Sequence, residues 1–384
     1  MTQPTIARGL EGVYVAESRL SRVDGLNGEL IIGGYDVQEL AGKASFEEVA
    51  HLLWRGNLPT RSELDELNAQ LVAARSLPYE VLSLIDALAG KKGMEPMAVL
   101  RTAISACALD DPDPQDRSPE AEYRRSMSIT ARIPTVVAAY HRLRTGHRPI
   151  PPRADLSHAA NFLWMFNGEA PAPVEVEALD AYLVCLSDHG MNASTFTSRT
   201  VVSTQSDVYS AIVAAIGSLK GVLHGGAPSA VLEMFRAVGS AERAEGWVRA
   251  EMEAGRRIMG IGHRVYKVRD PRAKILAEMS ERVADQTGHR ATYDLAREVE
   301  RVAVAVLEEL KPGRNLYANV EFYTATLHDL LGIPGDLFSS MFAMSRVSGW
   351  TAHVMAQLAD NRLIRPKAHY VGQTGLKFVP IDRR

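Results

Sequence analysis

Three histidines stand in short segments that are rich in glycine or polar residues. His189 lies in Asp-His-Gly-Met-Asn, His224 in Leu-His-Gly-Gly and His263 in Gly-Ile-Gly-His. A lone histidine is ordinarily structural, but a neighbouring glycine lets the backbone approach a ligand closely. The alternative for the His224 segment is a plain turn between helices. The spacing differs from His-Glu-x-x-His and no cysteine cluster accompanies it, so we predict no metal site.

Arginines supply a second group of candidates. Arg264 follows His263 directly, Arg272 follows an Asp-Pro pair, and Arg365 precedes a proline. Arg346 differs from these because its flanking segments, FAMS and VSGW, are largely apolar. A guanidinium in such surroundings needs an anionic partner. That partner is either a ligand carboxylate or a structural acidic residue, and the sequence leaves both open.

Glu321 is a carboxylate between apolar and aromatic neighbours, in Asn-Val-Glu-Phe-Tyr. Burial there would raise its pKa and make it a stronger base than an exposed glutamate. The alternative is a glutamate that stabilises a helix N-terminus.

Composition limits the function classes. The 384 residues include 46% hydrophobic and 23% charged residues, as in globular proteins, and the length favours two domains. The net charge of -3 gives no reason to predict nucleic-acid or anionic-membrane binding. The positive charge for an anionic substrate must therefore come from a few placed arginines.

The expected location is a reducing cytoplasm. The N-terminal segment MTQPTIARGLEG has no apolar core of a signal peptide, and no apolar run is long enough for a membrane span. Cys107 and Cys185 lie in apolar stretches, where we expect buried and inert thiols.

Helical periodicity dominates the chain after the first forty residues, where alternation around Asp24-Gly25 and Asn27-Gly28 predicts short strands. A stiff linker is expected at 148–153 and a helix that starts near Pro134 and ends at Thr145-Gly146. The expected helices span 46–54, 61–75, 79–88 and 95–109, and Ser45 is the expected N-cap of the first. These patterns predict an all-α fold with a minor β element.

Nine segments in order resemble the citrate synthase family almost end to end. They are GLEGVYVAESRLSRVDG, FEEVAHLLWRGNLP, LSHAANFLWMFNG, HGMNASTF, GVLHGG, GIGHRVYKVRDPRA, NVEFYTATL, SRVSGWTAHV and RLIRP. The resemblance implies a two-domain helical homodimer of the compact type, since no extended domain precedes Gly9. It implies a large domain of residues 1–218 plus 325–384, and a small domain of residues 219–324 that closes over the site.

The resemblance also implies roles for individual residues. His224 would lie beside the acetyl-CoA carbonyl, His263 would polarise the oxaloacetate carbonyl, and Glu321 would act as the base. The residues implied for oxaloacetate binding are His189, Arg272, Arg346 and Arg365, the last from the partner subunit. Lys267 and Arg314 occupy positions where the family often has cations for the CoA phosphates.

The implied reaction is the condensation of acetyl-CoA, oxaloacetate and water to citrate and CoA in the tricarboxylic acid cycle, with acetyl-CoA as a substrate and no cofactor. Two alternatives stay open: a 2-methylcitrate synthase that uses propionyl-CoA, and a paralog that binds these ligands without turnover. The sequence departs from the usual family pattern at Glu321, at Ala227-Pro228-Ser229 and at Gly33-Gly34-Tyr35. Most members of the family have aspartate at the position of Glu321, and a bacterial subgroup has glutamate there.

Overall fold

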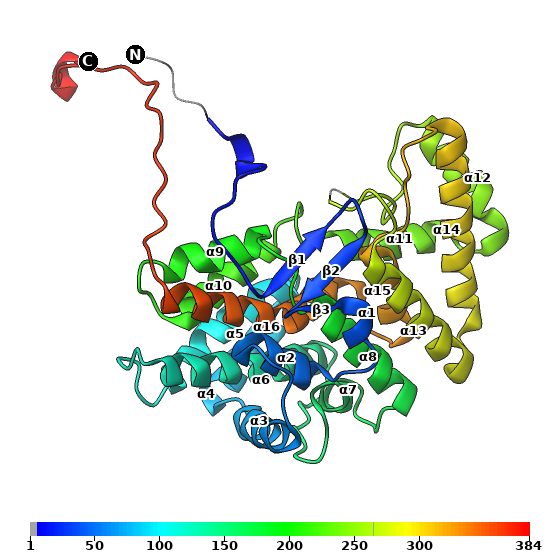
Figure 1. Cartoon of the computed structure of the whole chain (residues 1–384), viewed down its shortest axis with the longest axis horizontal. Helices are drawn as coiled ribbons and strands as arrows, with labels where there is room; N and C mark the ends of the chain where they lie inside the picture. Colours follow the sequence, from blue (N-terminus) through cyan, green and yellow to red (C-terminus); the bar gives the residue numbers. More distant parts are fainter. Residues whose placement is uncertain (1–5, 264) are drawn as a thin grey trace.

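The computed structural model describes residues 6–263 and 265–384, so Arg264 lies outside the described residues. Helices dominate these residues (Figure 1). The α-helices are α1 Val37–Leu40, α2 Phe46–Arg55, α3 Arg61–Ala74, α4 Tyr79–Ala89, α5 Pro96–Cys107, α6 Pro119–Arg144, α7 His158–Asn167, α8 Pro173–Leu186, α9 Ala193–Val202, α10 Val208–Leu219, α11 Ala227–Val238, α12 Ala244–Glu253, α13 Pro271–Thr287, α14 Arg290–Leu310, α15 Val320–Leu330 and α16 Phe338–Ala359. The 3-10 turns are η1 Arg8–Leu10, η2 Ala108–Asp110, η3 Ala241–Arg243, η4 Gly335–Leu337 and η5 Ile381–Arg383.

The predicted β element near the N-terminus is confirmed. Strands β1 Ser21–Asp24, β2 Glu29–Ile32 and β3 Tyr35–Asp36 form an antiparallel sheet in that order. The turn between β1 and β2 reaches a distant loop, where the carbonyl of Gly25 accepts the N–H of Lys267 at 2.7 Å. A Cβ at Gly25 would lie 2.2 Å from the Val265 carbonyl oxygen, so this approach requires glycine.

The predicted early helices are present, and their ends differ by one or two residues. Ser45 caps α2 as predicted, in a capping box with Glu48. Helix α5 ends at Cys107 and passes into η2. The predicted linker 148–153 lies between α6 and α7.

The prediction that a helix starts near Pro134 is wrong. Helix α6 begins at Pro119 behind the N-cap Ser118, and Pro134 lies inside it. An internal proline ordinarily costs a helix about 3 kcal/mol. The helix continues here because buried residues on both sides, including Ile133 and Val136, anchor it in the core.

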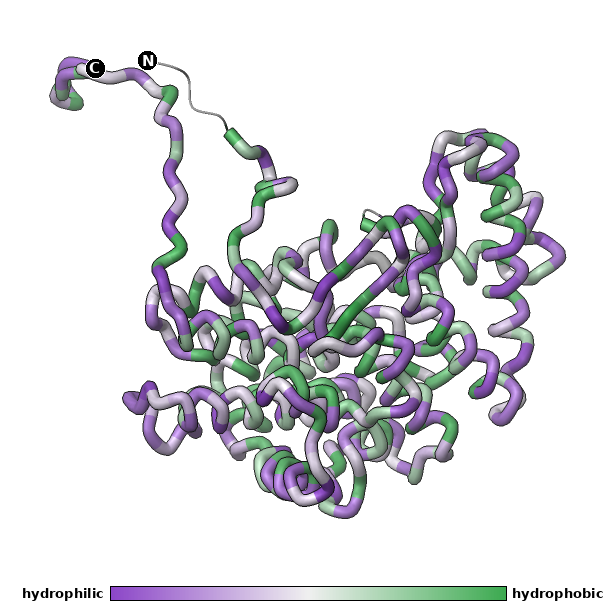
Figure 2. The backbone as a smooth tube through the Cα atoms, in the orientation of Figure 1, coloured by the Kyte–Doolittle hydropathy of each residue, from purple (hydrophilic) through white to green (hydrophobic). Residues whose placement is uncertain are grey.

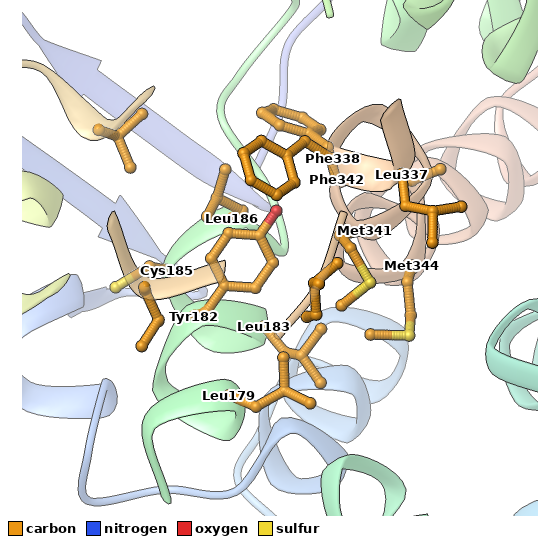
Figure 3. Packing of buried hydrophobic residues seen from close by; sticks show 14 of the residues in the cluster. Leu179, Tyr182, Leu183, Cys185, Leu186, Leu337, Phe338, Met341, Phe342 and Met344 are labelled. Atoms are coloured by element: carbon orange, nitrogen blue, oxygen red, sulfur yellow. The ribbon is translucent and has the colours of Figure 1, made fainter. Parts of the chain in front are cut away.

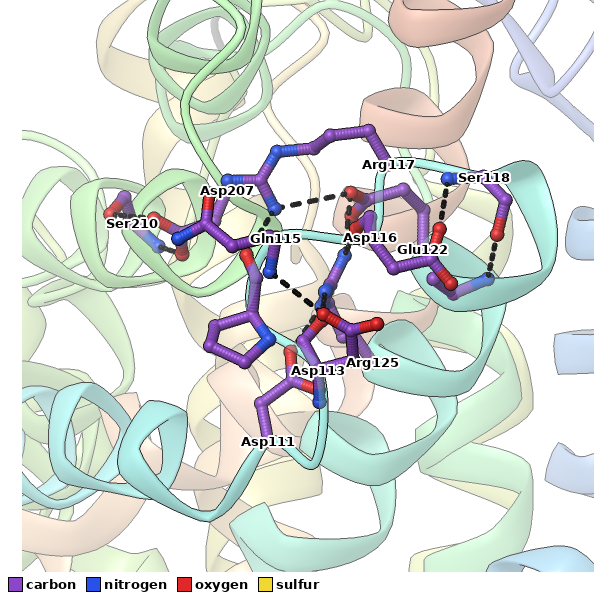
Figure 4. Close-up of polar contacts among 12 residues, drawn as sticks. Asp111, Asp113, Gln115, Asp116, Arg117, Ser118, Glu122, Arg125, Asp207 and Ser210 are labelled. Atoms are coloured by element: carbon purple, nitrogen blue, oxygen red, sulfur yellow. Dashed lines mark hydrogen bonds and ion pairs between the residues drawn. The ribbon is translucent and has the colours of Figure 1, made fainter.

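A buried arginine ties the loop before α6 to the helix itself (Figure 4). Arg125 lies 2.8 Å from Glu122 Oε1, donates to the carbonyls of Asp113 and Asp116, and also pairs with Asp111. These contacts satisfy a guanidinium that is only 2% exposed.

Helix α16 runs through the core and packs against α6, α8, α9 and α10. Figure 3 shows aromatic residues Phe338 and Phe342 of α16 beside Tyr182 and Leu186 of α8. Because α16 carries Arg346 and α8 leads directly to His189, this packing fixes two candidate site residues relative to one another.

Helices α11 to α14 lie together at one side of the molecule (Figure 1). Their surface is charged, as the sequence predicts, with ion pairs such as Arg249–Glu309 at 3.0 Å. Helix α13 packs against α8 and α15 and so joins this group to the rest. The exact domain limits stay a prediction.

Both terminal segments extend away from the helical body (Figures 1 and 2). The C-terminal arm, defined as residues 361–384, exposes several large apolar side chains, among them Tyr370, Val371 and Phe378. Within the described residues, no helix is both long and apolar enough to cross a membrane.

Candidate active site

His263 is held in one orientation by the backbone that follows it. Its Nδ1 atom accepts the N–H groups of Val265 and Tyr266, each at 3.0 Å. An Nδ1 that accepts hydrogen bonds leaves the proton of the neutral ring on Nε2. Burial and the nearby Arg272 lower the pKa of His263 to about 4. The imidazole is therefore neutral at pH 7 and presents an Nε2–H donor.

The loop that carries His263 is paired with the start of α15. Gly262 N–H donates to the Tyr317 carbonyl at 2.7 Å, and Asn319 N–H donates to the Gly260 carbonyl at 2.9 Å. The Asn319 side chain caps α15 and also donates to the Gly262 carbonyl at 2.8 Å. This pairing brings His263 and the first turn of α15 to the same place.

His189 faces the same loop. Its Nε2 atom lies 3.2 Å from the Tyr266 hydroxyl, and its ring centroid is 6.3 Å from that of His263. Burial, together with Arg272 and Arg346, holds the pKa of His189 well below its ordinary value.

The residue before His189 anchors this loop. The carboxylate of Asp188 is buried, accepts the hydroxyl of Ser21, and lies 3.2 Å from His353 Nε2. The Ser21 hydroxyl oxygen in turn accepts the N–H of Gly190 at 2.8 Å. The N-terminal sheet thus helps to position a candidate ligand-binding histidine.

His224 lies in the turn between α10 and α11, so its segment does form the turn between helices that the sequence offered as an alternative. Its Nε2 atom nevertheless contacts the Ser194 hydroxyl at 2.8 Å, and Trp350 Nε1 donates to the same oxygen at 3.0 Å. Burial and Arg346 lower the pKa of His224 to about 4, so this ring is also neutral at pH 7. A Cβ at Gly225 would lie 2.2 Å from the Leu219 carbonyl oxygen; the glycine serves backbone packing here.

Glu321 combines both alternatives that the sequence left open. It lies in the first turn of α15, and its Oε2 atom is buried with no hydrogen-bond partner among the described residues. Burial raises its pKa, against the opposing effects of Arg272 and Arg346. A partly desolvated carboxylate with a raised pKa is suited to act as a general base.

Arg272 is 2% exposed and paired with Asp270. Its Nε and Nη2 atoms donate to the two carboxylate oxygens at 3.0 and 2.8 Å. Burial acts against the charge of the Arg272 guanidinium, but the paired Asp270 carboxylate outweighs it and raises the pKa of Arg272. The charged form therefore lies near His263 and Glu321.

Arg346 differs because its positive charge has little compensation. Its Nε donates to the Leu186 carbonyl at 2.6 Å, while Nη2 is buried with no hydrogen-bond partner in the described parts of the chain. Burial lowers its pKa to about 10, although Asp188 acts in the opposite direction. A buried donor without a partner is costly, which favours a ligand carboxylate over a purely structural role.

Lys267 and Arg314 line one cavity together with His263 and Tyr266. Both cations are exposed. Arg365 is exposed near the start of the C-terminal arm, which extends away from the helical body (Figure 1).

The sequence reasoning missed several members of this site. Tyr266, Ser194 and Asp270 each contact a predicted residue. Asp270 carried a readable signal, because Asp before Pro is a common helix start, and it caps α13. Among the described residues, no group of three or more His, Cys, Asp and Glu side chains has metal-binding geometry.

Comparison with known proteins decides the family. The model of the family described as "Citrate synthase, C-terminal domain" matches residues 9–367. The chain belongs to the citrate synthase family.

Citrate synthase 2 of Bacillus subtilis is 45% identical over 99% of this chain and 100% of its own length. The citrate synthase of Haloferax volcanii is 46% identical over 99% of both chains. A 2-methylcitrate synthase of Mycobacterium tuberculosis is 40% identical over 96% of this chain and 91% of its own.

Solved citrate synthase structures share the fold. The enzyme of Pyrobaculum aerophilum has a TM-score of 0.90 at 36% identity, covering 99% of this chain and 95% of its own. The ternary complex of the Thermoplasma acidophilum citrate synthase with carboxymethyl coenzyme A and oxaloacetate has a TM-score of 0.90 at 31% identity, covering 99% and 100%. The chain is therefore an acyltransferase of the citrate synthase type.

Proposed function

We propose that the protein condenses acetyl-CoA with oxaloacetate and water to give citrate and CoA. The observation that carries the proposal is one group of side chains: neutral histidines, a carboxylate with a buried Oε2 atom and a raised pKa, and a buried arginine with an unpartnered donor. The bound oxaloacetate and coenzyme A analogue of the Thermoplasma acidophilum relative support the same substrates.

The first step removes a proton from the thioester methyl group. Glu321 takes this proton, and the C–H electron pair becomes the double bond of an enolate. A thioester methyl is a weak acid, so the developing negative charge on its oxygen requires a donor, which we assign to His224. Ser194 and Trp350 hold that ring in place.

The second step forms the carbon–carbon bond. The enolate carbon attacks the ketone of oxaloacetate, and His263 Nε2–H donates to the ketone oxygen as it becomes a hydroxyl. The fixed Nδ1 acceptor geometry aims this donor before the reaction starts. Water then attacks the citryl thioester, which releases a carboxylate and the CoA thiol.

Positive charge and a histidine hold the oxaloacetate. We assign its carboxylates to Arg272, Arg346 and, from the partner subunit, Arg365, and assign a further hydrogen bond to His189. Fork-shaped donors on planar carboxylates would fix which ketone face is presented. Lys267 and Arg314 are assigned to the CoA phosphates because they share a cavity with His263. We propose that acetyl-CoA is a substrate and that the reaction needs no cofactor.

We further propose a homodimer. Arg365 is exposed on the C-terminal arm, which extends away from the helical body of its own chain. The same arm exposes apolar side chains such as Leu376 and Phe378. A second copy of the chain would cover these side chains and receive Arg365 in its site. We also propose that the chain belongs to an active subgroup of the family in which Glu321 replaces the usual aspartate. The cytoplasmic location stays a prediction.

The second candidate activity is 2-methylcitrate synthesis, favoured by the relative in Mycobacterium tuberculosis. The extra methylene of propionyl-CoA changes binding by only about 1–3 kcal/mol in an apolar pocket. The same residues serve both reactions.

Thiol release from purified protein tests these proposals. Oxaloacetate is supplied with acetyl-CoA or propionyl-CoA at equal concentration, and the Glu321→Gln variant is the control. Cys107 and Cys185 are buried, with pKa values raised to about 11 and about 12, so they should add little background. Faster release with acetyl-CoA supports citrate synthesis, faster release with propionyl-CoA assigns methylcitrate synthesis, and release with neither contradicts both.

A further inference from the structure

A set of buried polar groups behind Glu321 has no hydrogen-bond partner in the described part of the chain. It consists of the Tyr182 hydroxyl, the Thr324 hydroxyl and both ring nitrogens of His328. Tyr182 and His328 are 0% exposed and Thr324 is 1% exposed. Buried polar groups are ordinarily satisfied, so such a group indicates bound water or a functional role.

These groups belong to one place in the fold. Glu321, Thr324 and His328 are spaced three and four residues apart on α15, which places them on one face of the helix. The ring of Tyr182 on α8 packs against the ring of His328, with centroids 4.5 Å apart. Figure 3 shows Tyr182 among Leu186, Phe338 and Phe342. The polar groups therefore lie in a core that is otherwise apolar.

Tyr182 is also within electrostatic reach of the catalytic groups. Burial has the largest effect and raises the pKa of Tyr182, Arg346 lowers it, and Glu321 raises it further. Glu321 Oε2 and Arg346 Nη2 also lack partners among the residues described. Four buried side chains with unmet hydrogen bonds, those of Tyr182, Thr324, His328 and Arg346, thus accompany the buried Oε2 atom of the proposed base.

Bound water would satisfy these unmet donors and acceptors. A buried water needs two to four polar partners, and hydroxyls can both donate and accept. Burial lowers the pKa of His328 to about 3, so its ring is neutral and also offers one donor and one acceptor. A water here could donate to Glu321 Oε2, leaving Oε1 free for the methyl proton.

We propose that Tyr182 is a positioning residue for Glu321, acting through water that is bound between Tyr182, Thr324 and His328. The inference rests on the proposed role of Glu321 as the base. The bound water orients the carboxylate and supplies the hydrogen bond that its buried oxygen lacks. Tyr182 itself does not touch the reacting atoms.

The test compares Tyr182→Phe with Tyr140→Phe. Both variants lose one buried hydroxyl, but Tyr140 lies on α6 and donates to the Met94 carbonyl at 2.5 Å. For each variant, kcat and the KM for both substrates are measured from pH 5 to 9, together with thermal unfolding.

Tyr182→Phe should lower kcat about 10-fold with little change in either KM, as expected when a catalytic group is misplaced. The acid limb of the kcat–pH profile of Tyr182→Phe should move to higher pH. Without the hydrogen bond from water the ionised form of Glu321 is less stable, so the pKa of Glu321 rises. The charged groups that face Glu321 are Asp270 and Arg272 at the start of α13 and Arg346 on α16, and they are unchanged in this variant. Tyr140→Phe should leave the pH profile unaltered.

Thr324→Val provides a second variant, because valine has nearly the same volume as threonine but lacks the hydroxyl. This variant should also move the acid limb of the kcat–pH profile to higher pH. A crystal structure of the wild type should show water between Tyr182 and His328. An unshifted acid limb in both variants, or a dry site, overturns the inference. An inactive wild type would instead overturn the proposed function, so the two failures are distinguishable.

Discussion

The Nδ1 atom of His263 accepts the backbone N–H of Tyr266 at 3.0 Å. This contact fixes the Nε2–H tautomer and aims it before substrate arrives. His263→Ala should lower kcat about 100- to 1000-fold, as the loss of an oriented donor does elsewhere. His147→Ala removes an exposed histidine outside the site and should leave kcat unchanged. Steady-state thiol release measures both, and near-normal turnover of His263→Ala would exclude the assigned role.

The length of the Glu321 side chain sets a second expectation. Glu321→Asp keeps the carboxylate but shortens its reach by one methylene, and a displacement of that size costs up to about 100-fold in kcat. Glu321→Gln cannot accept the proton and should lose about 1000-fold or more. The two variants are compared at saturating substrate. Equal activity of Glu321→Gln and the wild type would show that another group is the base.

Arg346 links substrate binding to stability. Arg346→Met should raise the KM for oxaloacetate about 10- to 100-fold, since a hydrogen bond to a charged group contributes about 1.5–3 kcal/mol. The same change removes a buried, poorly compensated charge, so the unfolding temperature without ligand should stay equal or rise. Arg301→Met, on the exposed side of α14, is the control. An unchanged KM would restrict Arg346 to a structural role.

Much of the site could be predicted because its residues carry local signals. Glycine beside histidine marked His224 and His263, and apolar flanks marked Arg346 as buried. The structure confirms that burial and also the raised pKa of Glu321. Their common location could not be worked out from spacing, and the family resemblance supplied it.

The site residues that the sequence did not predict belong to the site through contacts between distant segments. Ser194 reaches His224 and Tyr266 reaches His189 only after α9 and the 265–268 loop have packed. The same argument applies to Pro134, where burial of a long helix outweighs the local cost of proline. Local propensity carries no information on such tertiary contacts.

Asp180 sets a pH-dependent stability prediction. Burial, reinforced by Glu47, raises its pKa from 3.8 to about 8, against a hydrogen bond from the Phe46 N–H. The folded state therefore holds a proton that the unfolded state has released, and stability falls as pH rises from 3.8 through about 8. Asp180→Asn should be more stable at pH 8 by about 1 kcal/mol or more, and the difference should vanish near pH 4.

Chemical unfolding at pH 4, 6 and 8 measures this dependence. Asn keeps an oxygen that can accept the Phe46 N–H, so the variant removes the charge and preserves the contact. Asp86→Asn is the control because Asp86 is exposed. A stability difference that is the same at all three pH values would contradict the proposed titration of Asp180.

Arg365 allows the proposed sharing of sites to be tested by mixing two inactive proteins. His224→Ala and Arg365→Ala should each lose most activity alone. If Arg365 serves the partner's site, a mixed dimer has one site with both residues intact, so equal mixing after subunit exchange should restore roughly a quarter of wild-type activity. If Arg365 serves its own chain, neither site of the mixed dimer is intact and activity stays low. Mixing His224→Ala with His263→Ala is the control, because both residues belong to one chain's site and no recovery is expected. Recovery in that control as well would point to a different division of the site between subunits.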